Sequence, residues 1–104
     1  MKRNPIFCAI DTNDIHKATS LLSDIVPHIG GIKIGLEFFT SLGIKGIEEV
    51  KKFNKPLFID LKLYDIPNTV VAALRNILAL KPEYTTLHIS GGRRMLENCV
   101  EEKI

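Results

Sequence analysis

The 104-residue sequence predicts an α/β fold built from parallel (β/α) units, about the first four of the eight units in a TIM barrel. Four short apolar runs rich in β-branched residues alternate with segments of helical periodicity, which is typical of βαβ units. The first run reads as a continuous apolar stretch, as strands do in a parallel sheet that helices cover. Polar residues recur at Lys33, Asp60 and His88, 27 and 28 residues apart, and this spacing fits one βα repeat.

The first strand is expected at residues 6–10 (IFCAI), because this run is short, apolar and continuous. Residues 14–26 are expected to form a helix, since their apolar positions recur on one face and Asp14 is a suitable N-cap. A second strand follows at residues 31–35 (GIKIG). These three elements make the first βαβ unit.

The next helical segment covers residues 37–53, where Gly43 and Gly46 are expected to break the helix into two pieces. The third strand is expected at residues 56–63 (PLFIDLKL), a run that carries charged residues among apolar ones. This strand is the unusual one, because a strand buried in a parallel sheet normally contains few charges.

Residues 67–80 predict a third helix, with Pro67 in the first turn and an apolar stripe along one side. A fourth strand is expected at residues 84–90 (YTTLHIS), followed by a fourth helix at residues 92–104. The predicted order is therefore β-α-β-α-β-α-β-α, arranged as one domain over residues 1–104.

Two architectures fit this order, a small doubly wound sheet and part of a (β/α)₈ barrel. A barrel directs the polar residues at its strand ends toward the mouth of the active site. Here Asp11 follows the first strand, Lys33 lies in the second, and Asp60 and Lys62 lie in the third. This convergence favours the barrel, and because a complete barrel needs about 250 residues, four units correspond to about half of one.

Composition excludes several classes of function. The net charge of +2, with the basic residues scattered, gives no indication of a nucleic-acid partner. Cys8 and Cys99 have no spacing typical of a disulfide framework or a zinc site. No stretch is long and apolar enough for a signal peptide or a membrane span, so the expected location is the cytoplasm.

The run FIDLKLYDIPNT at residues 58–69 places three charges, Asp60, Lys62 and Asp65, among apolar residues. Asp60 and Lys62 are two residues apart, so on a strand their side chains share one face. Buried charges are unfavourable unless they are paired, and a buried cluster of charges is frequently functional. The stretch is therefore a candidate active site.

The sequence DLKLYDIPNTV resembles the signature of the orotidine 5′-phosphate decarboxylases, in which D-x-K-x-x-D-I-P-N-T follows the third barrel strand. Three flanking pieces agree in order and spacing: AID, IKIGLEFF and LHISGGRRML. The resemblance implies decarboxylation of orotidine 5′-monophosphate to uridine 5′-monophosphate in pyrimidine biosynthesis, with no metal or organic cofactor. The chain would be the N-terminal half of such a barrel.

The resemblance also implies roles for four charged residues. Lys62 matches the general acid that protonates the carbanion left by carbon dioxide, and Asp60 matches the aspartate that crowds the substrate carboxylate. Lys33 and Asp65 match the other members of an alternating Lys–Asp–Lys–Asp network. Alternation favours such a network, because each charge has neighbours of opposite sign.

Four further residues match substrate-binding positions of the family. Asp11 and Thr69 match residues that bind ribose hydroxyls, while Ile66 and Pro67 match the apolar wall near the departing carboxylate. In the family, the equivalents of Asp65, Ile66 and Thr69 reach into the site of the neighbouring subunit. The resemblance therefore implies a homodimer.

Taken singly, these residues also fit ordinary structural roles. Lys33 could be a lysine at a strand end, Asp11 part of a turn, and Asp65 a cap of the following helix. Thr69 could be a first-turn helix residue, and His88 is expected to have a structural hydrogen-bonding role.

Two other functions also fit the sequence. The phosphate-binding loops that the family carries after its later strands have no counterpart in the sequence, so the activity of this chain alone is doubtful. A non-catalytic remnant or interaction module of the same fold is therefore the first alternative. A magnesium-dependent sugar-phosphate lyase, which shares D-x-K-x-x-D, is a weaker one, because Ile66 to Thr69 (IPNT) are not expected there.

Overall fold

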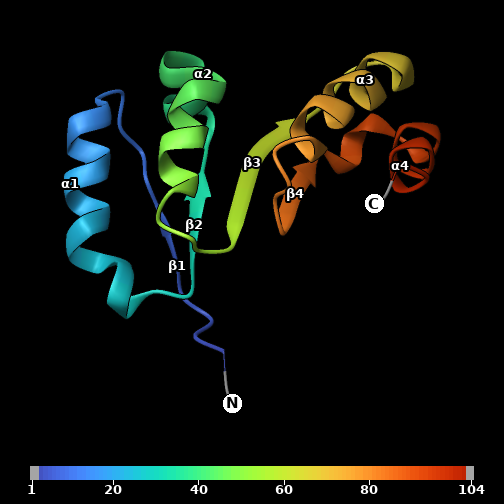
Figure 1. The fold of residues 1–104 in the computed structure, drawn as a ribbon. Coiled ribbons are helices and arrows are strands. Elements are labelled where there is room, and N and C mark those ends of the chain that lie inside the picture. Colours follow the sequence, from blue (N-terminus) through green and yellow to red (C-terminus); the bar gives the residue numbers. More distant parts are fainter. Residues whose placement is uncertain (1–2, 103–104) are drawn as a thin grey trace.

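The structure, a computed structural model, describes residues 3–102. Four strands and four α-helices alternate along the chain (Figure 1), with one 3₁₀ helix after α1 and another after β4. Their bounds are β1 Phe7–Ala9, α1 Ile15–Ile25, η1 Val26–His28, β2 Gly31–Ile34, α2 Leu36–Lys51, β3 Leu57–Leu63, α3 Pro67–Leu78, β4 Tyr84–Leu87, η2 Ile89–Gly91 and α4 Arg93–Val100. No helix within residues 3–102 is both long and apolar enough to cross a membrane.

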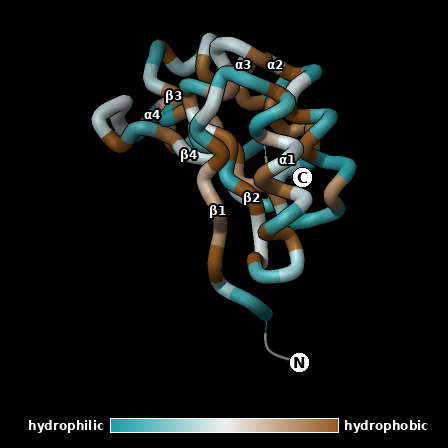
Figure 2. Tube along the Cα trace, turned by 90° about the vertical axis from the view of Figure 1, so that its left-hand side faces the viewer, coloured by the Kyte–Doolittle hydropathy of each residue, from teal (hydrophilic) through white to brown (hydrophobic). Residues whose placement is uncertain are grey.

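The four strands form one parallel sheet in the order β1-β2-β3-β4, so each strand pairs with the next one along the chain. The helices α1 and α2 lie beside β1 and β2, whereas α3 and α4 pack against each other near β3 and β4 (Figure 1). Polar and apolar residues alternate along the helices (Figure 2), as expected for helices that bury one side. The predicted order of elements is confirmed.

The core lies between the helices and one face of the sheet. Its larger cluster joins strand residues such as Ile32, Ile34 and Ile59 to Leu22 of α1 and Phe38 of α2. A second cluster holds α3 and α4 together, and its buried members are Val70, Leu74, Met95 and Cys99. Burial of these apolar side chains fixes which face of the sheet points toward the helices and leaves the other, inner face free for polar groups.

The inner face has an aromatic end at the beginning of the strands. Phe7, Phe58 and Tyr84 lie on three different strands, and their rings meet edge to face with centroids 5.9 to 6.3 Å apart. This geometry is favourable for aromatic pairs. The charged residues of the candidate site lie further along the same strands, toward the carboxyl ends.

Most predicted bounds agree with the structure to within two residues, but three predictions, for β4, α4 and α2, differ from it. The strand expected at residues 84–90 ends at Leu87, because the chain turns into the 3₁₀ helix η2. The helix expected at residues 92–104 covers Arg93–Val100, and it begins after Gly92 because the φ of 92° at Gly92 is not helical. Residues 103 and 104, which the prediction included in this helix, lie outside the residues that the structure describes. In α2 only Gly43, with a φ of 60°, interrupts the helix, so the expected break at Gly46 was wrong.

Thr85 on β4 has a buried hydroxyl that makes no hydrogen bond within the described residues. An unsatisfied buried hydroxyl is unfavourable. We therefore expect Thr85→Val, which keeps the β-branched shape, to raise the free energy of unfolding by about 1 kcal/mol. Urea denaturation measures this change, and a destabilised variant would show that the hydroxyl has a bonding partner after all.

Candidate active site

Three charged side chains meet on the inner face of the sheet, toward the carboxyl ends of the strands. Asp60 on β3 is only 7% exposed, and its Oδ2 lies 2.8 Å from Lys62 Nζ and 3.5 Å from Lys33 Nζ. Lys33 lies on the neighbouring strand β2, and Lys62 lies two residues after Asp60 on β3 itself. The sheet therefore pairs a buried carboxylate with two cations, which is what a buried charge requires.

The backbone of β3 is irregular at this site. Between the pairs Ile59–Thr85 and Leu63–Leu87 of the β3–β4 ladder, β3 has three residues and β4 has only Thr86. Lys62 lies in the irregular stretch with a φ of 52°, a left-handed conformation that is unfavourable by about 1–2 kcal/mol for a residue other than glycine. Its backbone N–H donates to Thr86 Oγ1 at 3.0 Å. A side chain of β4 thus accepts the hydrogen bond of this strained residue.

The electrostatics of the cluster favour an ionised Asp60. Burial by itself raises the pKa of Asp60, but hydrogen bonds from Lys62 and Thr86, together with the charges of Lys62 and Lys33, hold it below its ordinary value. The Thr86 hydroxyl donates to Asp60 Oδ1 at 2.6 Å. The side chains of Lys62 and Lys33 are 59% and 31% exposed, so the positive side of the cluster is open to an anionic ligand.

Asp11 lies at the same end of the sheet. It follows β1 and is exposed. A Cβ added to Gly35, at the end of β2, would lie 3.6 Å from Asp11 Oδ1 and 4.0 Å from the backbone oxygen of Asp60. The Asp11 carboxylate is therefore near the cluster, where it could accept hydrogen bonds from a bound ligand.

Asp65 lies in the exposed loop between β3 and α3. Its Oδ1 accepts a hydrogen bond of 2.6 Å from the N–H of Ile66, and among the described residues it forms no ion pair with Lys33 or Lys62. It does not cap α3 either, because the N-cap is Ile66, which makes no side-chain capping bond. One chain therefore brings together three of the four predicted charges, and Asp65 lies apart.

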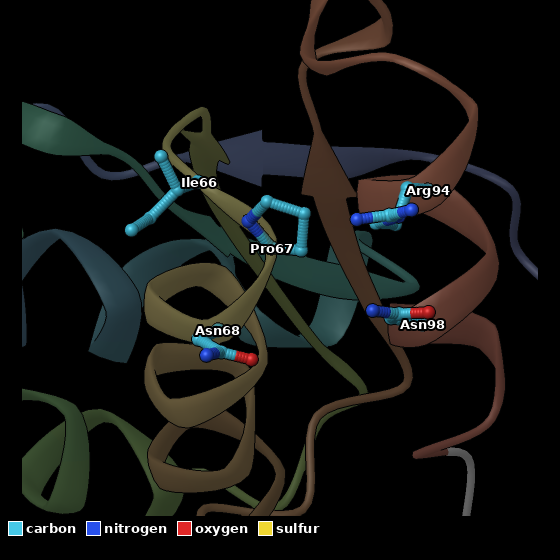
Figure 3. Close-up of a pocket in the computed structure, with 5 residues that line it drawn as sticks. All are labelled: Ile66, Pro67, Asn68, Arg94 and Asn98. Atoms are coloured by element: carbon cyan, nitrogen blue, oxygen red, sulfur yellow. The ribbon is translucent and has the colours of Figure 1, made fainter.

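The other predicted binding residues surround the start of α3. Ile66 is 65% exposed, Pro67 begins the helix, and Thr69 lies exposed in its first turn. An open pocket of about 410 Å³ separates this turn from α4, and Figure 3 shows Arg94 and Asn98 of α4 extending toward α3. None of the three charged residues of the cluster, Asp60, Lys62 and Lys33, lines this pocket, so the pocket is separate from the charge cluster.

A family model described as "Orotidine 5'-phosphate decarboxylase / HUMPS family" matches residues 4–103. The chain belongs to this family. Two curated relatives are named orotidine 5′-phosphate decarboxylase. The one from Wolbachia pipientis subsp. Culex pipiens is 50% identical over 97 residues, and the one from Wolbachia sp. subsp. Brugia malayi is 52% identical over 97 residues. Each alignment covers 93% of this chain and 43% of the relative, so the chain spans less than half the length of these family members.

Solved structures confirm the fold class. The orotidine 5′-phosphate decarboxylase from Pyrococcus horikoshii OT3 matches with a TM-score of 0.84 and 26% identity, over 92% of this chain and 47% of that one. An uncharacterized conserved protein from Geobacillus kaustophilus matches with a TM-score of 0.85 and 30% identity, over 93% of this chain and 45% of that one. The four (β/α) units are therefore part of the family's TIM barrel.

Sequence reasoning missed one polar member of the cluster, Thr86. The sequence offers two adjacent threonines, Thr85 and Thr86, and only the alternation of strand side chains could have placed Thr86 on the same face as His88. His88 itself has the expected structural role, because its Nδ1 accepts from Ser90 N–H at 3.2 Å and its ring stacks on Tyr64. In this family member the charge cluster thus has an uncharged fourth member.

Proposed function

We propose that this chain carries the decarboxylating residues of an orotidine 5′-phosphate decarboxylase, which converts orotidine 5′-monophosphate to uridine 5′-monophosphate and carbon dioxide. One observation carries the proposal: the buried Asp60 carboxylate is held between Lys62 and Lys33 at the carboxyl end of the sheet. Barrel enzymes have their active sites at this end. Membership of the family and the names of the curated relatives support the same reaction.

The cluster fits the chemistry of the reaction. Loss of carbon dioxide breaks the bond at C6 of the pyrimidine and leaves the electron pair on that carbon. The Lys62 ammonium supplies the proton that forms the new C–H bond, and its charge stabilises the carbanion before the transfer. A substrate carboxylate about 4 Å from Asp60 is repelled by about 4 kcal/mol at an effective dielectric of 20, and departure of carbon dioxide relieves this repulsion.

The remaining residues are assigned to substrate binding and to a second subunit. Asp11 and Thr69 bind the ribose hydroxyls, while Ile66 and Pro67 form the apolar wall beside the departing carboxylate. Asp65, Ile66 and Thr69 serve the neighbouring site of a homodimer. Their exposure, and the separation of Asp65 from the lysines of its own chain, support this assignment.

We place the enzyme in the cytoplasm and without a cofactor. Its two cysteines, Cys8 and Cys99, are both free, and free thiols are normal in the reducing cytosol. Within residues 3–102 no three His, Cys, Asp or Glu residues gather in a group that could hold a metal ion.

A chimeric barrel tests the proposed function directly. Residues 4–103 of this chain replace the matched segment of the Wolbachia relative, which is 50% identical to them. We expect the chimera to decarboxylate orotidine 5′-monophosphate. A folded chimera without activity would support the alternative that this chain is a non-catalytic remnant of the fold.

Metal chelation separates the two activities that share D-x-K-x-x-D. We expect EDTA to leave the turnover of the chimera unchanged, because the protein supplies the cation at the reacting carbon through Lys62. The same chimera dialysed against buffer alone is the control. Activity that is lost with EDTA and restored by magnesium would indicate a magnesium-dependent sugar-phosphate lyase instead.

A further inference from the structure

Thr86 closes a ring of hydrogen bonds around the charge cluster. Its hydroxyl accepts from the backbone N–H of Lys62 at 3.0 Å and donates to Asp60 Oδ1 at 2.6 Å. The other carboxylate oxygen, Asp60 Oδ2, accepts from Lys62 Nζ at 2.8 Å. Both ends of Lys62, its backbone and its ammonium, are therefore tied to one carboxylate, and Thr86 is the link at the backbone end.

The ring lies where the ladder between β3 and β4 is irregular. The regular ladder ends at Ile59, and the backbone bonds resume where His88 N–H donates to the carbonyl of Leu63 at 2.9 Å. In between, the N–H of Lys62 is directed to the Thr86 hydroxyl and Lys62 adopts its positive φ. A residue in a left-handed conformation persists only where its surroundings hold it. The bond to the Thr86 hydroxyl is a contact that holds the Lys62 backbone in this conformation.

We propose that Thr86 is a positioning residue, whose hydroxyl fixes the left-handed backbone of Lys62 and the rotation of the Asp60 carboxylate, and thereby the place of the Lys62 ammonium. Its catalytic meaning rests on the proposed function, because only a decarboxylase needs the Lys62 proton at a defined carbon. A hydroxyl suits this role, since it donates to one partner and accepts from the other without adding charge. Small displacements of a reacting group lower reaction rates strongly, so loss of the contact that positions Lys62 is expected to lower the rate of decarboxylation strongly.

The test measures the contacts themselves in the 104-residue chain, without substrate. Carbon-detected NMR follows the titration of the Asp60 carboxyl, and amide hydrogen exchange follows the Lys62 N–H. Besides Thr86 on β4, the groups that face Asp60 are Lys62 on β3 and Lys33 on β2, with Asp11 near the end of β1. All of these groups are retained in the variants, which change only one residue of β4, so a change in either measurement follows from loss of that side chain's hydroxyl.

We compare Thr86→Val, Thr86→Ser and the matched control Thr85→Val, which removes the neighbouring hydroxyl that bonds to nothing among the described residues. Thr86→Val is expected to raise the pKa of Asp60, because one donor to its carboxylate is lost. It is also expected to speed exchange of the Lys62 amide about fivefold, the effect of one ordinary hydrogen bond. Thr86→Ser should restore both values, and Thr85→Val should change neither.

The proposal is overturned if a folded Thr86→Val chain keeps the titration of Asp60 and the exchange rate of Lys62, or if Thr86→Ser fails to restore them. If Thr86→Val does not fold, Thr86→Ala removes the same hydroxyl with less bulk and gives the same decision. In the chimera, Thr86→Val should lower kcat at least tenfold with little change in KM. If the chimera is inactive but Thr86→Val changes the Asp60 titration and the Lys62 exchange as expected, the proposed function is refuted and the contacts of Thr86 stand. If the chimera is active but Thr86→Val changes neither measurement, only this inference is refuted.

Discussion

Lys62→Ala is expected to abolish decarboxylation in the chimeric barrel, lowering kcat by about 10³-fold or more. The reason is that one ammonium both stabilises the carbanion at C6 and supplies its proton. Lys33 is not expected to replace it, because the Lys33 Nζ approaches Asp60 Oδ2 from the neighbouring strand, at 3.5 Å, and the proposed function assigns the proton to Lys62. Steady-state turnover of orotidine 5′-monophosphate measures the loss, and circular dichroism checks that the barrel is folded.

Lys81→Ala is the matched control for this experiment. Lys81 follows α3 and has a φ of 57°, close to the 52° of Lys62, but it takes no part in the cluster. The same substitution in the same backbone conformation should leave turnover within about twofold of the parent, because surface changes away from a site have little effect. Substantial activity in the Lys62→Ala chimera would remove Lys62 from the proton-donating role.

Two inactive variants are expected to restore activity when their subunits mix. If Asp65 serves the neighbouring site and Lys62 serves its own, a hybrid of Lys62→Ala with Asp65→Asn has one site with both changes and one site with neither. The intact site takes Lys62 from the Asp65→Asn chain and Asp65 from the Lys62→Ala chain. Activity per hybrid dimer should therefore rise from near zero to about half that of the parent, which is a large and positive signal.

Chimeric barrels are mixed under conditions of verified subunit exchange, and differently tagged chains identify the hybrids. Mixing each variant with itself is the control, since it gives no intact site. If Asp65 completes the site of its own chain, both sites of the hybrid remain defective. Continued inactivity of purified hybrids would thus contradict the cross-subunit assignment, while leaving the roles of Lys62 and Asp60 untouched.

The sequence was sufficient to predict the order of the elements and the meeting of Lys33, Asp60 and Lys62. The order follows from alternating strands and helices, which imply a parallel sheet, and the shared face of Asp60 and Lys62 follows from their spacing of two on a strand. The place of Lys33 in the same charge network was implied by the family resemblance. Asp60 and Lys62 do form an ion pair, and Lys33 joins them from the neighbouring strand. The catalytic roles of Lys62, Asp60, Lys33 and Asp65 stay predictions, as do the substrate and dimer roles of the other site residues, which are Asp11, Ile66, Pro67 and Thr69.

The role of Thr86 and the irregular backbone at Lys62 could not be predicted in the same way. A register shift leaves no mark on composition, and a lysine gives no sign that it will adopt a positive φ. The fourth strand was expected to reach residue 90 because Ile89 continues its β-branched run, but the strand ends at Leu87, where the chain turns into the 3₁₀ helix η2. Such details depend on the contacts between strands, which a single sequence does not contain.

The order of the strands has a consequence for how the molecule forms. Every ladder joins neighbouring strands, and the paired residues Phe7 and Gly31, or Phe58 and Tyr84, are only 24 and 26 positions apart. Each strand needs only the strand before it as a partner, so a chain leaving the ribosome can add one βα unit at a time to the edge of the sheet already made. The partners of Asp60 arrive in the same order, since β2 brings Lys33 before Asp60 itself is synthesised and β4 brings Thr86 after it. The charge cluster is thus complete only when the fourth strand docks on β3.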